Sequence, residues 1–118
     1  MNKIREILFY KDYFREFYGD QRPKVQKKIL WTLKVLEDHD RIPEIYFKHM
    51  EGINRLYEIR VQSGSDIFRI FCFFDKNNLV VVGNGFQKKT QKTPPNEIDR
   101  ALRIKNEYYE EKKKLNKP

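Results

Sequence analysis

Three short segments rich in β-branched and aromatic residues follow one another in the middle of this 118-residue chain, and they constrain its fold more than any other feature. The segments are Arg55–Gln62, Asp66–Asp75 and Leu79–Val82. Two connectors with the length and residue types of tight hairpin turns separate them, Ser63-Gly64-Ser65 and Lys76-Asn77-Asn78. The pattern predicts an antiparallel meander whose third strand leads into a lysine-rich loop, Asn84–Pro94.

The residues before the meander predict a strand and a pair of helices. Apolar residues within Lys3–Lys11 favour a first strand. Asp12 is suited to cap a short helix, Tyr13–Tyr18, and Pro23 is suited to the first turn of a second helix. Apolar residues recur at helical spacing along this second helix: Val25, Ile29, Leu33 and Leu36. We expect the next segment, Glu44–Gly52, to be irregular and partly extended.

After the meander, Thr93 or Asn96 is suited to cap a final helix with Ile98, Ala101 and Leu102 on one side. Residues 110–118 are mostly charged, and we expect them to fray. We expect residues 1–118 to form one domain of the α/β (α+β) class. Its antiparallel meander is covered on one face by the N-terminal helix pair and followed by a C-terminal helix.

The chain is basic, with a formal net charge of +8 and a pI of about 9.6. This balance favours a polyanionic partner such as nucleic acid, although it also fits a protein that is only kept soluble by its charge. We expect a cytoplasmic protein without a membrane partner, because no apolar run approaches the ~18 residues that span a bilayer and no signal peptide opens the chain. Cys72 lies among phenylalanines and is expected to be a buried thiol.

Side-chain alternation along the strands places three charged residues on one face of the sheet. Because Tyr57, Ile59 and Val61 suit burial under the helices, Glu58 and Arg60 should project from the opposite, uncovered face. The same reasoning on the next strand places Arg69 beside them, and we expect both arginines to be exposed. A salt-bridged pair on a solvated face is one interpretation, and a phosphate-binding site is the other.

The lysine-rich loop and nearby rings favour the second interpretation. Lys88, Lys89 and Lys92 lie close to the predicted arginine face, and the rings expected beside them are Phe71, Phe73 and Phe86. Cations interleaved with aromatic rings suit single-stranded RNA, whose phosphates pair with cations and whose bases stack on rings. His39 and His49 are isolated in the sequence and suggest no metal pair, so we expect neither a metal nor a cofactor. His49 is a weak candidate acid or base.

Several motifs together resemble the RelE/ParE toxin superfamily, and most closely its HigB-like, phage-derived branch. The resemblance covers nearly the whole domain. Its motifs are Leu56-Tyr57-Glu58-Ile59-Arg60-Val61, Phe68-Arg69-Ile70-Phe71, and Asn84-Gly85-Phe86-Gln87-Lys88-Lys89-Thr90-Gln91-Lys92-Thr93-Pro94 with Glu97-Ile98 and Ala101.

The resemblance implies a type II toxin that cuts mRNA on the translating ribosome without a metal. It implies a cognate antitoxin, often with a helix-turn-helix, and a toxin that is monomeric when alone. Arg60 and Arg69 fall on catalytic basic positions of such toxins, and Lys88, or else Lys89, falls near a third. Glu58 stands where some relatives have lysine, so it is either a base or the group that holds Arg60.

Two other functions remain open at this point. A ParE-like inhibitor of DNA gyrase acts by protein contact and needs no catalytic arginines, and an orphan nucleic-acid binder needs no catalysis. For the antitoxin, we expect docking on the surface of the helix pair, because aromatic anchors dominate interface energetics. The candidate anchors are Tyr13, Phe14, Phe17 and Trp31, with a core role as the alternative for these rings.

Overall fold

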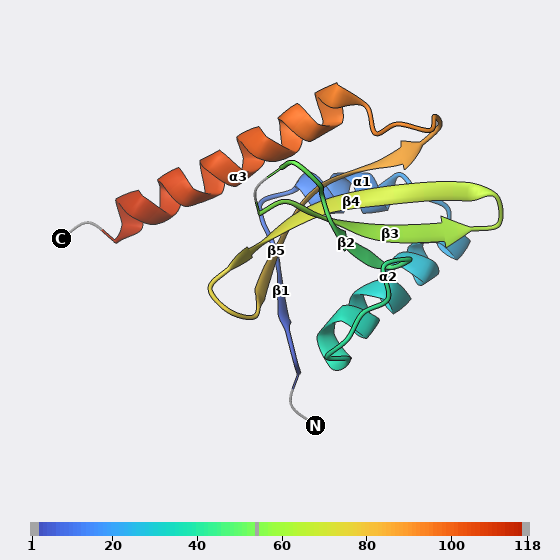
Figure 1. Cartoon of the computed structure of the whole chain (residues 1–118), viewed down its shortest axis with the longest axis horizontal. Coiled ribbons are helices and arrows are strands. Elements are labelled where there is room, and N and C mark those ends of the chain that lie inside the picture. Colours follow the sequence, from blue (N-terminus) through green and yellow to red (C-terminus); the bar gives the residue numbers. More distant parts are fainter. Residues whose placement is uncertain (1–2, 54, 117–118) are drawn as a thin grey trace.

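In the computed structural model, which describes residues 3–53 and 55–116, a five-stranded sheet lies between a helix pair and a single long helix (Figure 1). The strand order is β1-β5-β4-β3-β2. The elements in chain order are β1 (Glu6–Phe9), α1 (Tyr13–Gly19), α2 (Pro23–Asp38), β2 (Phe47–His49), β3 (Tyr57–Ser63), β4 (Asp66–Asp75), β5 (Leu79–Lys88) and α3 (Pro95–Leu115). The predicted α+β class is confirmed. No helix in the described part of the chain is long and apolar enough to cross a membrane.

The predicted meander is confirmed, but its third strand is longer than predicted. β3, β4 and β5 pair antiparallel in chain order, and β5 continues through Lys88 instead of ending at Val82. Between Ile70 and Cys72 the register shifts, because β4 advances two residues while β5 advances three, from Gly85 to Val82. This bulge accommodates the extra residue of β5 within residues 83–85. Phe86 and Lys88 therefore still lie on the same face as Arg69.

The sheet gains one strand at each edge from segments outside the meander. β1 pairs parallel with β5, which confirms a strand within Lys3–Lys11 and places it at the far edge of the sheet. Part of Glu44–Gly52 forms β2, a short strand that pairs antiparallel with β3. The expectation that this segment is partly extended is therefore confirmed, and β2 adds a new neighbour to β3.

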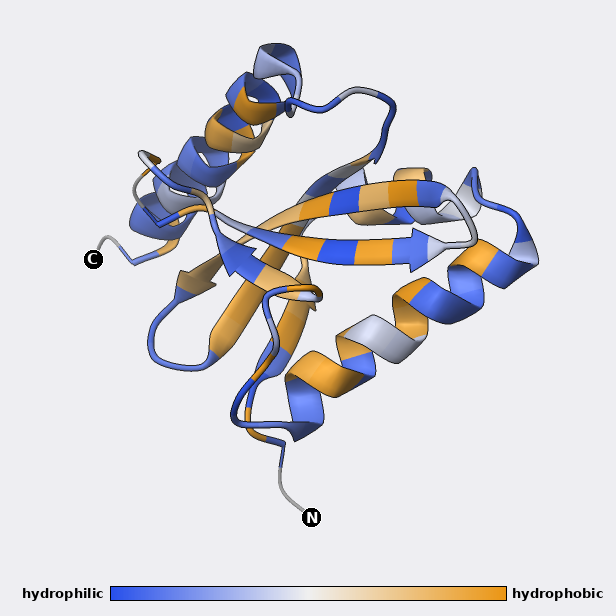
Figure 2. Cartoon of the chain, turned by 45° about the vertical axis from the view of Figure 1, so that its right-hand side comes forward, coloured by the Kyte–Doolittle hydropathy of each residue, from blue (hydrophilic) through white to orange (hydrophobic). Residues whose placement is uncertain are grey.

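The helix pair α1 and α2 covers one face of the sheet, as predicted. The apolar stripe of α2 packs in one core with alternate residues of β3, β4 and β5. Figure 2 shows the alternation most clearly as orange and blue bands along β3. Phe14 and Phe17 are buried in this core, so they cannot serve as surface anchors for an antitoxin. Trp31 remains 46% exposed, and Tyr13 is half-buried with its hydroxyl donating to Glu107.

The opposite face is partly covered, which corrects the prediction of an open sheet face. α3 lies across it and encloses a second core that includes Leu56, Phe71, Phe86 and Ala101. This helix continues to Leu115, so the tail beginning at residue 110 is mostly helical where the structure describes it. Its last turns are held by buried Asp75, whose carboxylate accepts hydrogen bonds from Tyr108 and from Lys112 at 2.7 Å.

Candidate phosphate-binding site

Arg60 and Arg69 lie directly opposite each other on β3 and β4, and Phe86 of β5 continues the same row. The neighbouring row pairs Glu58 with Phe71. Directly paired residues on adjacent strands have their side chains close together on one face, so the register alone brings the predicted carboxylate and both arginines together. They lie on the face that α3 leaves partly open.

Glu58 is the buried centre of this cluster. Its side chain is 6% exposed, and Oε1 accepts a hydrogen bond from Nε of Arg60 at 2.8 Å. Oε2 lies 3.7 Å from Nε of Arg69, within ion-pair distance but beyond a hydrogen bond. One carboxylate therefore faces two guanidinium groups, which leaves the cluster with a net positive charge.

Arg69 is more buried than the sequence predicts. Its side chain is 11% exposed, and Nη1 donates to the carbonyl oxygen of Phe68 at 3.1 Å. Burial lowers the pKa of the Arg69 guanidinium, Glu58 opposes this shift, and Arg60 adds to it. Arginine nevertheless stays charged at neutral pH, so Arg69 is a fixed cation held inside the sheet face.

Arg60 is the accessible member of the pair. Its side chain is 25% exposed, and Nη1 donates to the carbonyl oxygen of Glu44 at 3.3 Å. Among the described residues, Nη2 of Arg60 donates to no acceptor. This guanidinium is thus held at two points and still presents a donor edge toward two surface hollows that it lines.

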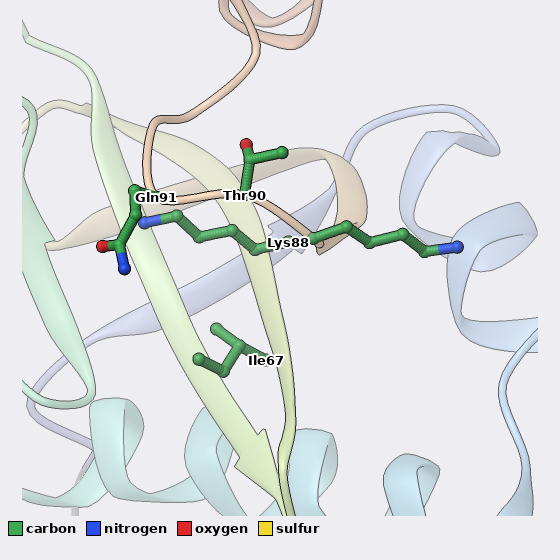
Figure 3. Close-up of a pocket in the computed structure, with 5 residues that line it drawn as sticks. Ile67, Lys88, Thr90 and Gln91 are labelled. Atoms are coloured by element: carbon green, nitrogen blue, oxygen red, sulfur yellow. The ribbon is translucent and has the colours of Figure 1, made fainter.

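The lysines lie next to this cluster, around a shallow hollow of about 390 Å³. Figure 3 shows Ile67, Lys88, Thr90 and Gln91 around it, and Lys89 also lines it. Lys88 is paired with Ile67 at the end of β5, on the same face as Arg69. The hydroxyl of Thr90 donates to the carbonyl oxygen of Lys92 at 2.7 Å, and Lys92 is exposed on the loop that follows the hollow.

The phenylalanines predicted to stack on RNA bases are core residues instead. Phe71, Phe73 and Phe86 are 1%, 2% and 8% exposed, and the rings of Phe71 and Phe86 stack on each other 5.6 Å apart. The prediction that Phe71 and Phe86 lie on an open RNA-binding surface is wrong, because α3 packs on that part of the sheet. Both rings belong to the second core, on strand positions next to Glu58 and Arg69.

Lys48 is a basic neighbour that sequence reasoning missed. It is directly opposite Glu58 on β2, on the side away from Phe71, and it is half-buried. The alternation of Phe47, Lys48 and His49 could have placed Lys48 on the face of Glu58. A strand of three residues is too short, however, for its alternation to be recognised in the sequence. The same register puts His49 opposite Tyr57 on the helix-covered face, so His49 points away from the arginines.

Buried Cys72 lies on the helix-covered face, and burial raises the pKa of its thiol. Among the described residues, no three His, Cys, Asp or Glu side chains are grouped so that they could hold a metal ion. The site therefore consists of fixed cations around one carboxylate. Such an arrangement can bind a phosphodiester through charge-assisted, bidentate hydrogen bonds.

A family model matches most of the chain. Residues 14–106 match the family model described as Phage derived protein Gp49-like (DUF891), a range that runs from α1 into α3 and contains every residue of the cluster. A comparison with curated proteins gives no match. Since the family model covers well over half of the sequence, the chain belongs to the Gp49-like family of phage-derived proteins, which is a RelE/toxin-like family.

Proposed function

We propose that this protein is the toxin of a type II toxin–antitoxin system, of the HigB-like kind, and that it cleaves mRNA on the ribosome. The observation that carries the proposal is the buried carboxylate of Glu58 between Arg60 and Arg69. Membership of a RelE/toxin-like family supports the toxin assignment. The catalytic activity rests on the chemistry of the cluster.

In the proposed reaction, a ribose 2′-oxygen attacks its own 3′-phosphorus. The new bond joins phosphorus to the 2′-oxygen, and the bond from phosphorus to the 5′-oxygen of the next nucleotide breaks. Arg60 binds the phosphate from its exposed edge, and Arg69 adds a fixed positive charge behind it. Their charges stabilise the phosphorane more than the ground state, which is the usual source of electrostatic catalysis.

In this proposal a lysine protonates the leaving group, because both histidines lie outside the cluster. The Lys88 ammonium donates a proton to the leaving 5′-oxygen, and solvent or the ribosome accepts the proton of the 2′-hydroxyl. Glu58 is assigned a positioning role, since its Oε1 accepts the hydrogen bond from Arg60. With few proton-transfer groups of its own, the enzyme depends on the ribosome to align the attacking oxygen.

The proposal also includes a cognate antitoxin that closes the basic site or docks nearby. Of the four candidate anchors, Tyr13 is half-buried and Trp31 is 46% exposed, and these two are the anchors we now expect. Hydrogen exchange on the free and bound toxin tests this docking. Protection confined to the Arg60 face and the Lys88 loop, without protection on the helix pair, would show that the antitoxin binds elsewhere.

The function is tested by primer extension on mRNA from induced cells, beside a gyrase supercoiling assay with purified protein. The proposal expects new 5′ ends within translated regions and unaffected gyrase. Intact transcripts with inhibited gyrase would identify a ParE-like toxin instead. Intact transcripts together with active gyrase would indicate a nucleic-acid-binding protein without catalytic activity.

A further inference from the structure

A second hollow, of about 360 Å³, lies beyond Arg60 at the edge of the sheet. β2 begins at Phe47 at this end, and beyond Ile59 the edge of β3 is met by Tyr46, whose carbonyl oxygen accepts a hydrogen bond from the Arg60 amide at 2.7 Å. The lining residues are Lys28, Ile45, Tyr46, Arg60, Gln62 and Gly64. Its volume is within the range of small-ligand clefts, roughly 300–1,000 Å³.

The chemistry of this hollow is a ring, an exposed apolar side chain and two cations. Tyr46 is half-buried and meets Trp31 edge to face, with ring centroids 5.3 Å apart, so its ring is held in one orientation. Nζ of Lys28 lies 4.3 Å from the centroid of Trp31 and 6.0 Å from that of Tyr46. Ile45 is 67% exposed and presents its apolar side chain to this hollow.

This hollow is continuous with the candidate phosphate-binding site. Arg60, Gln62 and Ile45 also line a smaller hollow that reaches Arg69 and Ile67. Ile67 in turn lines the hollow of Lys88 and Lys89. Shared lining residues place the three hollows next to one another as one track, which runs from Lys88 on the sheet face past Arg60 to Lys28 of α2 at the sheet edge.

We propose that the hollow of Tyr46 and Lys28 is a subsite for one base of single-stranded RNA. The base stacks on Tyr46 with Ile45 against it, while Lys28 and Arg60 pair with the flanking phosphates. Charge complementarity and the position of the hollow on the track favour RNA as the occupant, because an RNA strand whose phosphate lies at Arg60 must continue along the track. This inference rests on the proposed function and adds a specific binding position to it.

Trp31 provides a direct test, because it is the only tryptophan of the chain and contacts Tyr46. A short 2′-O-methyl RNA, which lacks the attacking hydroxyl, is titrated at low salt into the full-length protein. Dye anisotropy reports binding, and Trp31 emission reports occupancy of the hollow. The expected result is saturable quenching with the same midpoint as binding. An abasic oligonucleotide of equal length should give weaker binding and little quenching.

Matched variants separate the ring from its surroundings. Tyr46→Phe keeps the stacking face and should bind like wild type, whereas Tyr46→Leu should weaken binding about 5- to 100-fold, as expected when one stacked base is lost. Lys28→Met should lower the salt dependence of binding. Lys24→Met removes the same charge from an exposed position on α2 outside the hollow, and it should change little.

The outcomes distinguish this inference from the proposed function. RNA binding that is lost in Arg60→Ala, but equal in Tyr46→Leu and Tyr46→Phe with unchanged Trp31 emission, would overturn the subsite alone. No binding by the wild-type protein at low salt would overturn both the subsite and a direct RNA contact at Arg60. Quenching that the abasic oligonucleotide reproduces would show that phosphate, and not a base, occupies the hollow.

Discussion

Arg60 and Arg69 are direct cross-strand partners, and both guanidinium groups lie within ion-pair distance of the one carboxylate of Glu58. Like charges directly opposite each other destabilise a sheet, and a buried carboxylate offsets only part of that cost. A pairing that costs stability and leaves net positive charge on a partly open face is typical of a functional site, where strain and charge are retained for chemistry.

The two arginines should differ in their effect on stability. Arg69→Ala leaves Glu58 with one partner in a buried position, and we expect it to lower the free energy of unfolding by about 2–4 kcal/mol. Arg60→Ala, at a more exposed position, should cost about 1–2 kcal/mol. In a Glu58→Gln background the cost of Arg69→Ala should fall, because Arg69 then has no carboxylate partner to lose. Urea denaturation of wild type, Arg69→Ala, Glu58→Gln and the Glu58→Gln/Arg69→Ala double variant measures this coupling. Additive effects of the two changes would contradict it.

Gly85 should tolerate no side chain while its neighbour Gly83 should tolerate one. An ideal Cβ at Gly85 would lie 2.6–2.8 Å from the ring of Phe17, whereas one at Gly83 would meet Ile104 at an ordinary 3.4 Å. Gly85→Ala should therefore destabilise the protein by about 1–3 kcal/mol through overpacking. Gly83→Ala serves as the matched control. Equal denaturation midpoints for the two variants would show that α1 moves aside freely.

The anchor of α3 should be sensitive to acid. Burial alone would raise the pKa of Asp75, but hydrogen bonds from Lys112 and Tyr108 outweigh it and hold the pKa below its usual value. A lowered folded-state pKa contributes stability that is complete above the unfolded value of about 3.9 and is lost as the pH falls. Asp75→Asn should thus be less stable than wild type at neutral pH, and the difference in stability should narrow as the pH falls below the unfolded value. A difference in the free energy of unfolding that stays constant with pH would show that the ionisation of Asp75 does not cause it.

The lysines of the hollow should act through phosphate contacts. Replacing Lys88 and Lys89 together with glutamine should weaken RNA or ribosome association and flatten its salt dependence, because each lost phosphate contact reduces the salt slope by about one. A double replacement of Lys113 and Lys114, on the last turn of α3, removes equal charge far from the site in sequence and serves as the control. Identical salt slopes in both double variants would mean that Lys88 and Lys89 are only solvated charge.

The sequence predicts the meander, the helix pair and the cluster of Glu58, Arg60 and Arg69, because alternation along strands sorts residues reliably onto two faces. It does not predict that α3 covers part of the functional face, because the apolar stripe of a helix does not say where the helix docks. The misplacement of Phe71 and Phe86 follows from that error. The longer β5 was missed because glycine and asparagine usually end strands, and the bulge that accommodates them depends on pairing with β4.

The most direct test of the central claim is the rate of mRNA cleavage in a reconstituted translation system. The variants are wild type, Arg60→Ala, Arg60→Lys and, as a matched control, Arg103→Ala at an exposed position on α3. We predict that wild type and Arg103→Ala cleave mRNA and that folded Arg60→Ala cleaves it at least about a hundredfold more slowly. Arg60→Lys should recover only part of the rate, because lysine cannot bind phosphate bidentately. Undiminished cleavage by Arg60→Ala, or none by the wild-type protein, would contradict the central claim.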